Sequence, residues 1–246
     1  MFDLTGRAAL VTGAGQNVGA GIARALAARG ASVVVNDLVG SRAGAVEQQI
    51  LAAGGRATTA VFDVTDLDAV QGAVSGLGAI DILVNNAGNG GADPMPVAPF
   101  RTMDPADWHG PLDVNLYGVL NTTRTVIEGM VERGRGRVIT VVSGAGTAGV
   151  AIGVSPYAAA KAGAAGFMRA LALEVASAGV TANSIALGLM DNVADAGSVE
   201  HLARSIPARR LGRPDDAGAA CVYLASDEAS WMTGQTIGLN GGALTS

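Results

Sequence analysis

The sequence predicts an α/β fold of the doubly wound type, with a seven-stranded parallel sheet covered by helices on both faces. Short runs of β-branched and other apolar residues alternate along the chain with longer, alanine-rich stretches of helical pattern. The short runs are nearly continuous rather than alternating in polarity, as expected of strands that are buried on both faces. Glycine-rich loops at 88–92 and 144–153 follow two of these runs, at the edge where open α/β sheets bind ligands.

The predicted strands follow the β-branched runs in chain order. They cover residues 8–11, 31–36, 57–62, 80–84, 137–142, 180–185 and 236–239. Because successive strands are joined by helix-length segments, we expect right-handed crossovers between parallel strands.

Helices are predicted between these strands, at 18–29, 41–53, 66–76, 104–131, 156–178 and 214–226. Ser41 is expected to cap the second helix, and the Gly54–Gly55 pair should end it. The Gly110–Pro111 pair should break the fourth helix, because proline lacks an N–H and clashes with the preceding turn. We therefore expect a short helix, a break and then a long helix in that region.

The composition indicates one globular unit. A chain of 246 residues with 49% hydrophobic residues can bury one sizeable core, and no repeat or linker divides it, so we expect a single domain over residues 1–246. The net charge of −5 and the scattered arginines argue against a nucleic-acid surface. No apolar run approaches the roughly 20 residues of a membrane span.

Cysteine and histidine usage points to a cytoplasmic protein without a metal. Cys221 is the only cysteine, so no internal disulfide can form, and the N-terminus has neither a basic start nor a long apolar run. His109 and His201 stand alone, without the neighbouring ligands that a metal site needs. We expect both to be surface or structural residues.

A glycine-rich stretch, VTGAGQNVGAG at residues 11–21, follows the first predicted strand and leads into a helix near Val18. The free N–H groups and the macrodipole at such a helix start attract a pyrophosphate. Glycine turns without ligands are common, so the stretch alone is weak evidence. Asn17 stands where the middle glycine of such a loop would be expected. Asparagine tolerates a left-handed backbone best among non-glycine residues, so we expect it to adjust the nucleotide site without abolishing it.

Asp37 ends the second predicted strand, 18 residues after Gly19, where a carboxylate can accept hydrogen bonds from ribose hydroxyls. A turn or capping role is the alternative. The negative charge would repel the 2′-phosphate of NADP, and the next residue is Leu38 rather than a cation, so NAD is the expected cofactor. Arg42 is the feature that argues for NADP, because its side chain could turn back toward the phosphate. A solvated position on the next helix is the simpler expectation for it.

Tyr157 and Lys161 lie four residues apart in the sequence YAAAK, which places both on one face of the predicted helix 156–178. The spacing alone is a frequent coincidence. Composition adds weight here, because fifteen of the 16 basic residues are arginine and Lys161 is the only lysine. A compact ammonium differs in function from a guanidinium, so a lysine at this position suggests a specific role.

In order and spacing, segments along essentially the whole chain resemble the short-chain dehydrogenase/reductase family. They are TGAGQNVG (12–19), DV (63–64), NNAG (85–88), VN (114–115), Ser143 in VVSGAG, YAAAK (157–161) and the tail from LGRP to LNGG (211–242). The resemblance implies a Rossmann-type fold and an oxidoreductase that interconverts a secondary alcohol and a ketone with NAD. The four-residue spacing in YAAAK argues against the enoyl-reducing branch of the family.

The resemblance also implies a catalytic tetrad of Asn115, Ser143, Tyr157 and Lys161. Tyr157 would act as general acid and base, Lys161 would lower its pKa and hold the nicotinamide ribose, and Ser143 would hydrogen-bond the substrate oxygen. Asn115 would hold a water that links Lys161 to solvent. Taken singly, each has a structural alternative: a helix-face aromatic for Tyr157, a turn residue for Ser143 and a helix-kink residue for Asn115.

By the same resemblance, the cofactor would contact the glycine loop, the strand ends and the segment after the sixth strand. These residues are Gly13, Gln16, Asn17, Val18, Gly19, Asp37, Leu38, Asp63, Val64, Asn86, Ala87, Gly88, Tyr157, Lys161, Gly188 and Met190. Asp63 would contact the adenine, with helix capping as its alternative.

The chain departs from the family pattern at the nicotinamide end. Leu187 stands where the family has a proline before glycine, and Asn192 stands where a threonine often contacts the carboxamide. The segment 63–81 is also about one helical turn shorter than usual, which should trim an outer helix.

The segments 89–100, 144–155 and 189–206 would line the substrate pocket, and they supply mostly Gly, Ala, Val, Pro and Met. This composition favours a small or apolar alcohol or ketone. One alternative is an NADPH-dependent 3-oxoacyl reductase acting on acyl-carrier or CoA thioesters. Its cations would come from Arg101, Arg204, Arg209 and Arg210.

A catalytically silent NAD-binding sensor or scaffold is the alternative from another class. The resemblance implies a homotetramer in either case. Its long helices 104–131 and 156–178 would pair across one two-fold axis and the segment 214–246 across another.

Overall fold

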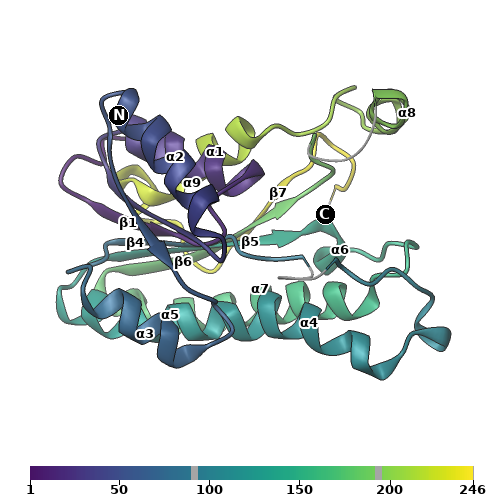
Figure 1. Ribbon diagram of the computed structural model, residues 1–246, viewed down its shortest axis with the longest axis horizontal. Coiled ribbons are helices and arrows are strands. Elements are labelled where there is room, and N and C mark those ends of the chain that lie inside the picture. Colours follow the sequence, from purple (N-terminus) through teal and green to yellow (C-terminus); the bar gives the residue numbers. More distant parts are fainter. Residues whose placement is uncertain (90–93, 192–195, 246) are drawn as a thin grey trace.

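In the computed structural model, which describes residues 1–89, 94–191 and 196–245, seven parallel strands form one sheet (Figure 1). They are β1 (Ala8–Val11), β2 (Ser32–Asp37), β3 (Arg56–Val61), β4 (Ile82–Asn85), β5 (Gly136–Ser143), β6 (Val180–Leu187) and β7 (Thr236–Leu239). Their order across the sheet is β3-β2-β1-β4-β5-β6-β7, and every pairing is parallel. The predicted doubly wound fold is confirmed.

Two helical layers sandwich the sheet (Figure 1). One face carries α1 (Asn17–Ala28), α2 (Gly40–Ala52) and α9 (Pro214–Ala225), and the other carries α3 (Leu67–Ser75), α5 (Gly118–Glu132) and α7 (Ser155–Val175). Short helices α4 (His109–Leu112), α6 (Gly144–Thr147) and α8 (Ala196–Ser205) lie in the connections. The sequence did not predict α6, which lies in the glycine-rich loop 144–153, or α8, which lies in the segment 189–206.

Successive side chains of a strand pack alternately into the apolar core on one face of the sheet and the apolar core on the other face. In β1, Ala9 and Val11 pack under α1, α2 and α9, whereas Leu10 between them packs under α3, α5 and α7. All three side chains are fully buried. Because both faces of the sheet are covered, both sets of alternating positions must be apolar, which explains the nearly continuous apolar runs in the sequence.

The prediction that Ser41 caps α2 is wrong. The helix begins at Gly40, after Val39 in an extended conformation, and no side chain caps it. The Val39 N–H donates to Asp37 Oδ1 at 2.9 Å, so the carboxylate that ends β2 holds the turn into α2. Gly54 follows the helix with φ +81°, as the predicted stop requires.

The predicted break at Gly110–Pro111 is also wrong. The chain stays helical from Pro105 to Glu132 and changes its winding instead, through a 3₁₀ turn (Pro105–Trp108), α4, a π-helical turn (Asp113–Tyr117) and α5. Pro111 is the third residue of α4, so its missing N–H falls among the donors that a helix start leaves unbonded in any case. The site residue Asn115 lies in the π-helical turn that follows.

Within the described ranges, no helix is long and apolar enough to cross a membrane. Cys221 is buried in α9 with a free thiol. His109 and His201 are exposed, as expected. The described residues contain no group of His, Cys, Asp and Glu side chains that could hold a metal ion.

Candidate active site

A cleft of about 860 Å³ opens at the carboxyl ends of the strands. It spans both sides of the point between β1 and β4 where the strand order reverses, which is where open α/β sheets bind ligands. All sixteen predicted cofactor residues line it, together with Ser143. Asn115 is fully buried behind this wall.

Two glycines of the loop after β1 are required by close contacts. A Cβ on Gly19 would lie 2.2 Å from the Gly13 carbonyl oxygen and 2.4 Å from Asn86 Nδ2. Gly13 has φ +59°, and a Cβ there would lie 2.8 Å from Ala87 Cα. Both positions therefore exclude a side chain, and the loop packs directly against the segment after β4.

Asn17 adopts the backbone expected of it, with φ +46° in the left-handed region. It begins α1, and its side chain is exposed at the cleft. Among the described residues, the N–H groups of Asn17, Val18 and Gly19 have no protein acceptor, and the first bonded one is that of Ala20, which donates to the Gln16 carbonyl at 3.1 Å. Free N–H groups at a helix start beside an open cleft fit the phosphates of a dinucleotide.

Asp37 ends β2 with its carboxylate buried and both oxygens in use. Oδ2 accepts the Gly15 N–H at 3.1 Å, and Oδ1 accepts the Val39 N–H at 2.9 Å. The turn role considered from the sequence is therefore part of what Asp37 does. Each oxygen keeps a second lone pair at the cleft, so the carboxylate can still accept from ribose hydroxyls.

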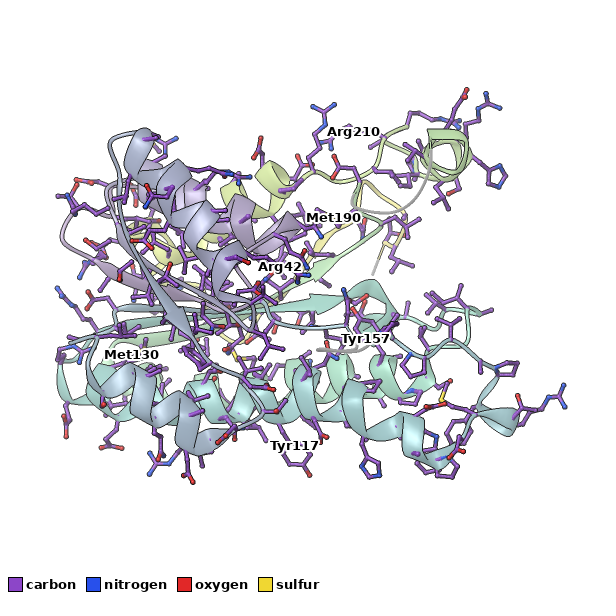
Figure 2. The ribbon with its side chains drawn as sticks, viewed as in Figure 1. Arg42, Tyr117, Met130, Tyr157, Met190 and Arg210 are labelled. Carbon is purple, nitrogen blue, oxygen red and sulfur yellow. The ribbon has the colours of Figure 1, made fainter. Side chains whose placement is uncertain are left out.

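Arg42 is exposed on α2, as expected (Figure 2). It also lines the cleft, as do Leu38 and Val39. A Cβ on Gly15 would lie 2.7 Å from Arg42 Cβ and 2.6 Å from Asp37 Oδ2. The glycine loop, the carboxylate and the arginine therefore converge at one end of the cleft.

The segment after β3 forms the floor beside this end. Asp63 Oδ1 accepts the N–H and the hydroxyl of Thr65, at 2.9 and 2.8 Å. The N-cap of α3 is Asp66, whose carboxylate accepts the Ala69 N–H at 3.1 Å, so Asp63 does not cap that helix. Val64 is buried and lines the cleft, with its carbonyl accepting from Asn121 Nδ2 at 3.0 Å.

Thr12 holds the segment after β4, a role that sequence reasoning missed. Its Oγ1 accepts the N–H groups of Asn86 and Ala87 at 3.0 and 3.1 Å. Asn86 Nδ2 donates back to the carbonyls of Thr12 and Gly13 at 2.9 and 3.0 Å. Asn36 is a second missed residue, because its Oδ1 accepts the Gly13 N–H at 3.3 Å.

Asn115 ties the loop after β4 to the π-helical turn. Its Nδ2 donates to the carbonyls of Pro111 and Asn89 at 2.8 and 2.7 Å, and its Oδ1 accepts the Asn89 N–H at 3.1 Å. A Cβ on Gly88 would lie 2.8 Å from Asn115 Oδ1 and 3.1 Å from Lys161 Nζ, so both side chains flank the same glycine. Whether Asn115 also holds a water stays a prediction.

Lys161 is buried on α7, with 4% of its surface exposed. Its Nζ donates to the Val141 carbonyl at 2.8 Å and lies 5.8 Å from the centre of the Tyr157 ring. Burial lowers the pKa of the Lys161 amine to about 8, because the charged form loses its hydration. The amine is therefore still protonated at neutral pH, but it binds its proton less firmly than the amine of a surface lysine does.

Tyr157 is the third residue of α7 and is half-buried in the cleft wall (Figure 2). Burial raises the pKa of its hydroxyl, and hydrogen bonding with Ser143 lowers that pKa by a smaller amount. Ser143 Oγ accepts the Ala145 N–H at 3.1 Å, which fixes it at the start of α6. The resemblance implied that Lys161 lowers the Tyr157 pKa, but the influences found in the structure are burial and Ser143.

Leu187, Gly188, Leu189 and Met190 form the far end of the cleft after β6. Leu187 pairs with Ser143 of β5 and Leu239 of β7, and the Gly188 N–H donates to the Leu239 carbonyl at 3.0 Å. A leucine in place of the family's proline therefore lets β6 run on to the cleft. Asn192 lies outside the described residues.

The cleft has further lining residues that the sequence did not assign to the cofactor. They are Asn36, Val39, Arg42, Phe62, Asn89, Pro94, Met95, Val114, Val141, Val142, Leu187 and Leu189. Asn89, Pro94, Met95 and Leu189 fall within the predicted substrate segments. The remainder lie at or near strand ends, apart from Arg42 on α2 and Val114 in the π-helical turn, and only the topology of the sheet brings them to one place.

Comparison with known proteins gives the site its context. The chain matches the short chain dehydrogenase family over residues 7–202. It is 37% identical over 249 residues to the 3-oxoacyl-acyl-carrier-protein reductase of Vibrio harveyi, covering 98% of each chain. Two solved structures are also similar. One is a gluconate 5-dehydrogenase from Burkholderia cenocepacia J2315 in complex with NADP and tartrate (TM-score 0.89, 35% identity, 98% of this chain and 96% of that chain). The other is a 3-oxoacyl-acyl-carrier-protein reductase with bound NAD from Brucella melitensis (TM-score 0.92, 32% identity, 99% and 94%).

Proposed function

The chain belongs to the short-chain dehydrogenase/reductase family, and from that premise we propose that it interconverts a secondary alcohol and a ketone at Asn115, Ser143, Tyr157 and Lys161. Family membership makes it an NAD(P)-dependent oxidoreductase. The observation that carries the proposed roles is that Ser143, Tyr157 and Lys161 line one end of a cleft whose other end has free N–H groups and a carboxylate suited to a dinucleotide. Strand spacing puts Asp37 of β2 and Ser143 of β5 about 14 Å apart across the sheet, at roughly 4.8 Å per strand.

Each part of the cleft has a proposed task in cofactor binding. The N–H groups from Asn17 to Gly19 would hold the phosphates, Asp37 the adenosine ribose, and Tyr157 with Lys161 the nicotinamide ribose. When bound, the cofactor supplies or accepts the hydride at the substrate carbon.

The side chains then handle the proton. In ketone reduction, the Tyr157 hydroxyl donates its proton to the carbonyl oxygen as the carbon gains a hydride, and Ser143 holds that oxygen in place. The raised pKa keeps Tyr157 protonated at neutral pH, which suits this direction. In alcohol oxidation Tyr157 must accept the proton, and the proposed role of the Lys161 ammonium, 5.8 Å from the centre of the Tyr157 ring, is to favour the phenolate at that step.

NAD is the proposed cofactor, on the basis of Asp37. A buried carboxylate at the end of β2 disfavours a neighbouring 2′-phosphate, and Leu38 brings no compensating charge. Arg42 on the cleft wall is the feature that favours NADP, and the similar structures hold NADP in one case and NAD in the other. The ratio of kcat/KM for NADH and NADPH decides between them.

Reduction of 3-oxoacyl thioesters is the second candidate. It is favoured by the 37% identity to the Vibrio harveyi reductase, whose name states that activity. A catalytically silent sensor is the third, and the presence of all four tetrad residues in one place argues against it.

We also propose a cytoplasmic homotetramer. Two apolar side chains on neighbouring elements support an interface between copies: Trp231 is fully exposed and Leu173 on α7 is 84% exposed. The loop after Trp231 touches α7, since a Cβ on Gly234 would lie 3.5 Å from Ala172 Cβ. The single, buried Cys221 suits a reducing compartment.

A screen of diverse secondary alcohols and ketones, with NAD and NADP side by side, tests the proposal. Turnover that prefers NAD is the expected result. Tight cofactor binding without turnover of any compound would instead support the sensor.

A further inference from the structure

The substrate end of the cleft, beyond Ser143 and Tyr157, has mainly apolar walls, with Asn89 as a polar but uncharged lining residue. Pro94 and Met95 follow β4, and Leu189 and Met190 follow β6. Apart from Tyr157, the ionisable side chains among the described lining residues are Asp37, Arg42, Asp63 and Lys161. Asp37 and Asp63 lie at or just after the ends of β2 and β3, and Arg42 lies in the first turn of α2, all on the nucleotide side. Lys161 is bound to the Val141 carbonyl.

Beyond the cleft-lining residues Pro94 and Met95, the chain carries exposed apolar side chains. Val97, Phe100, Val150 and Ile152, which we call the apolar rim, are 65, 55, 40 and 60% exposed. The two segments that carry the rim are joined, because the Ala98 N–H donates to the Gly153 carbonyl at 3.0 Å. Ala98 follows Val97 and Gly153 follows Ile152 in the chain, so this hydrogen bond holds the backbones next to these two rim residues together.

Three of the four arginines that could serve a charged thioester substrate are bound to other groups, and none of the four lines the cleft. Arg204 pairs with Glu200, and Arg210 makes two hydrogen bonds to the Asp216 carboxylate at 2.6 and 2.9 Å. Arg209 donates to the Arg204 carbonyl at 2.6 Å. The residues outside the described ranges, 90–93, 192–195 and 246, include no basic residue. Neither Arg101 nor Arg209 has an acidic partner among the described residues, and Arg101 alone of the four makes no side-chain hydrogen bond there.

We infer that the substrate is an uncharged ketone, or the corresponding alcohol, whose apolar hydrocarbon group runs from Ser143 along Met95 and Leu189 to the apolar rim. A carboxylate or phosphate on that group would lose hydration without gaining a cation, which is unfavourable. The inference rests on the proposed oxidoreductase function. It separates this chain from relatives named for acyl-carrier thioesters or gluconate.

A series of methyl ketones of increasing chain length, each paired with the same ketone bearing a terminal carboxylate, tests the inference with NADH and with NADPH. We expect kcat/KM to rise about fourfold per added methylene, as for burial in an apolar site, until the chain spans the rim. The terminal carboxylate should lower kcat/KM at least tenfold. Higher kcat/KM for acetoacetyl-CoA or 5-ketogluconate than for every neutral ketone would overturn the inference while leaving the proposed function intact. No turnover of any ketone would overturn both.

Two variants place the hydrocarbon group on the rim. Ile152→Asp should lower kcat/KM for the longest ketone at least tenfold and change it little for the shortest. The control, Leu51→Asp on α2, should change neither, because Leu51 is also exposed, at 42%, but belongs to neither segment that carries the rim. An equal loss for short and long ketones in Ile152→Asp would contradict the inference. Arg101→Ala should leave kcat/KM for the neutral ketones unchanged. If the charged ketones have higher kcat/KM than the neutral ones in the wild type, and Arg101→Ala lowers kcat/KM for the charged ketones alone, Arg101 binds their charged group and the inference is wrong.

Discussion

Replacing Lys161 with methionine tests whether the only lysine of the chain is held as a buried ammonium. Burial lowers the pKa of Lys161 from 10.5 to about 8, so between these values the unfolded chain binds one more proton than the folded protein. Stability must then rise with pH across this interval, by about 1.4 kcal/mol per pH unit and about 3 kcal/mol in all. Below pH 8 the amine is charged in both states, and its full burial penalty opposes folding.

Urea unfolding of both proteins from about pH 7 to about pH 10 measures this effect. Other titrating groups are common to the two proteins and should largely cancel in the difference. Between pH 8 and 10, the wild-type free energy of unfolding should gain about 2–3 kcal/mol relative to the Lys161→Met variant. A difference that stays constant with pH would refute the burial argument. Isotope-labelled lysine offers a direct check, since its single side-chain signal should titrate near 8.

Three further changes test other parts of the cleft and the assembly. Asp37→Ala combined with Leu38→Arg should shift the preference toward NADPH, measured as a ratio of kcat/KM values, and a wild type that already prefers NADPH would show the cofactor assignment to be wrong. Gly19→Ala should weaken NADH binding about 5- to 150-fold in a fluorescence titration, since relieving a 2.2 Å contact costs about 1–3 kcal/mol. Gly44→Ala on α2, where a Cβ meets nothing within 4 Å, should leave binding unchanged, and equal losses in both would implicate general unfolding. Trp231→Asp should reduce the molar mass found by light scattering, whereas an unchanged mass would exclude Trp231 from an interface.

The strands were predictable because their chemistry is local. A strand buried on both faces needs a nearly unbroken apolar run, because alternate residues pack into the cores on opposite faces of the sheet. In β1, Leu10 packs into one core and its neighbours Ala9 and Val11 pack into the other. The winding of the chain around Pro111 was not predictable in this way. The sequence shows a helix breaker, but its effect depends on where the helix starts, and a start at His109 makes the proline harmless.

The residues of the candidate site that belong to sequence motifs were predictable, whereas those brought to the site only by the topology of the sheet were not. The residues nominated from the sequence for cofactor binding, together with Ser143, all line the cleft, and Asn115 is buried behind them. Thr12 and Asn36 were missed, because each looks like an ordinary strand-end residue until neighbouring strands bring the backbone N–H groups of other segments to their side chains. The effect of burial on the Tyr157 pKa likewise depends on packing that no local pattern reveals.

Turnover by Tyr157→Phe shows whether Tyr157 is the acid and base of the proposed NAD-dependent alcohol–ketone site. The substitution removes one hydroxyl and keeps the ring, so NADH binding measured by fluorescence should be nearly unchanged. Loss of the proton donor should lower kcat by about 10²- to 10⁴-fold for the best ketone found with the wild type. Unchanged kcat in the variant would show that Tyr157 is not the proton donor.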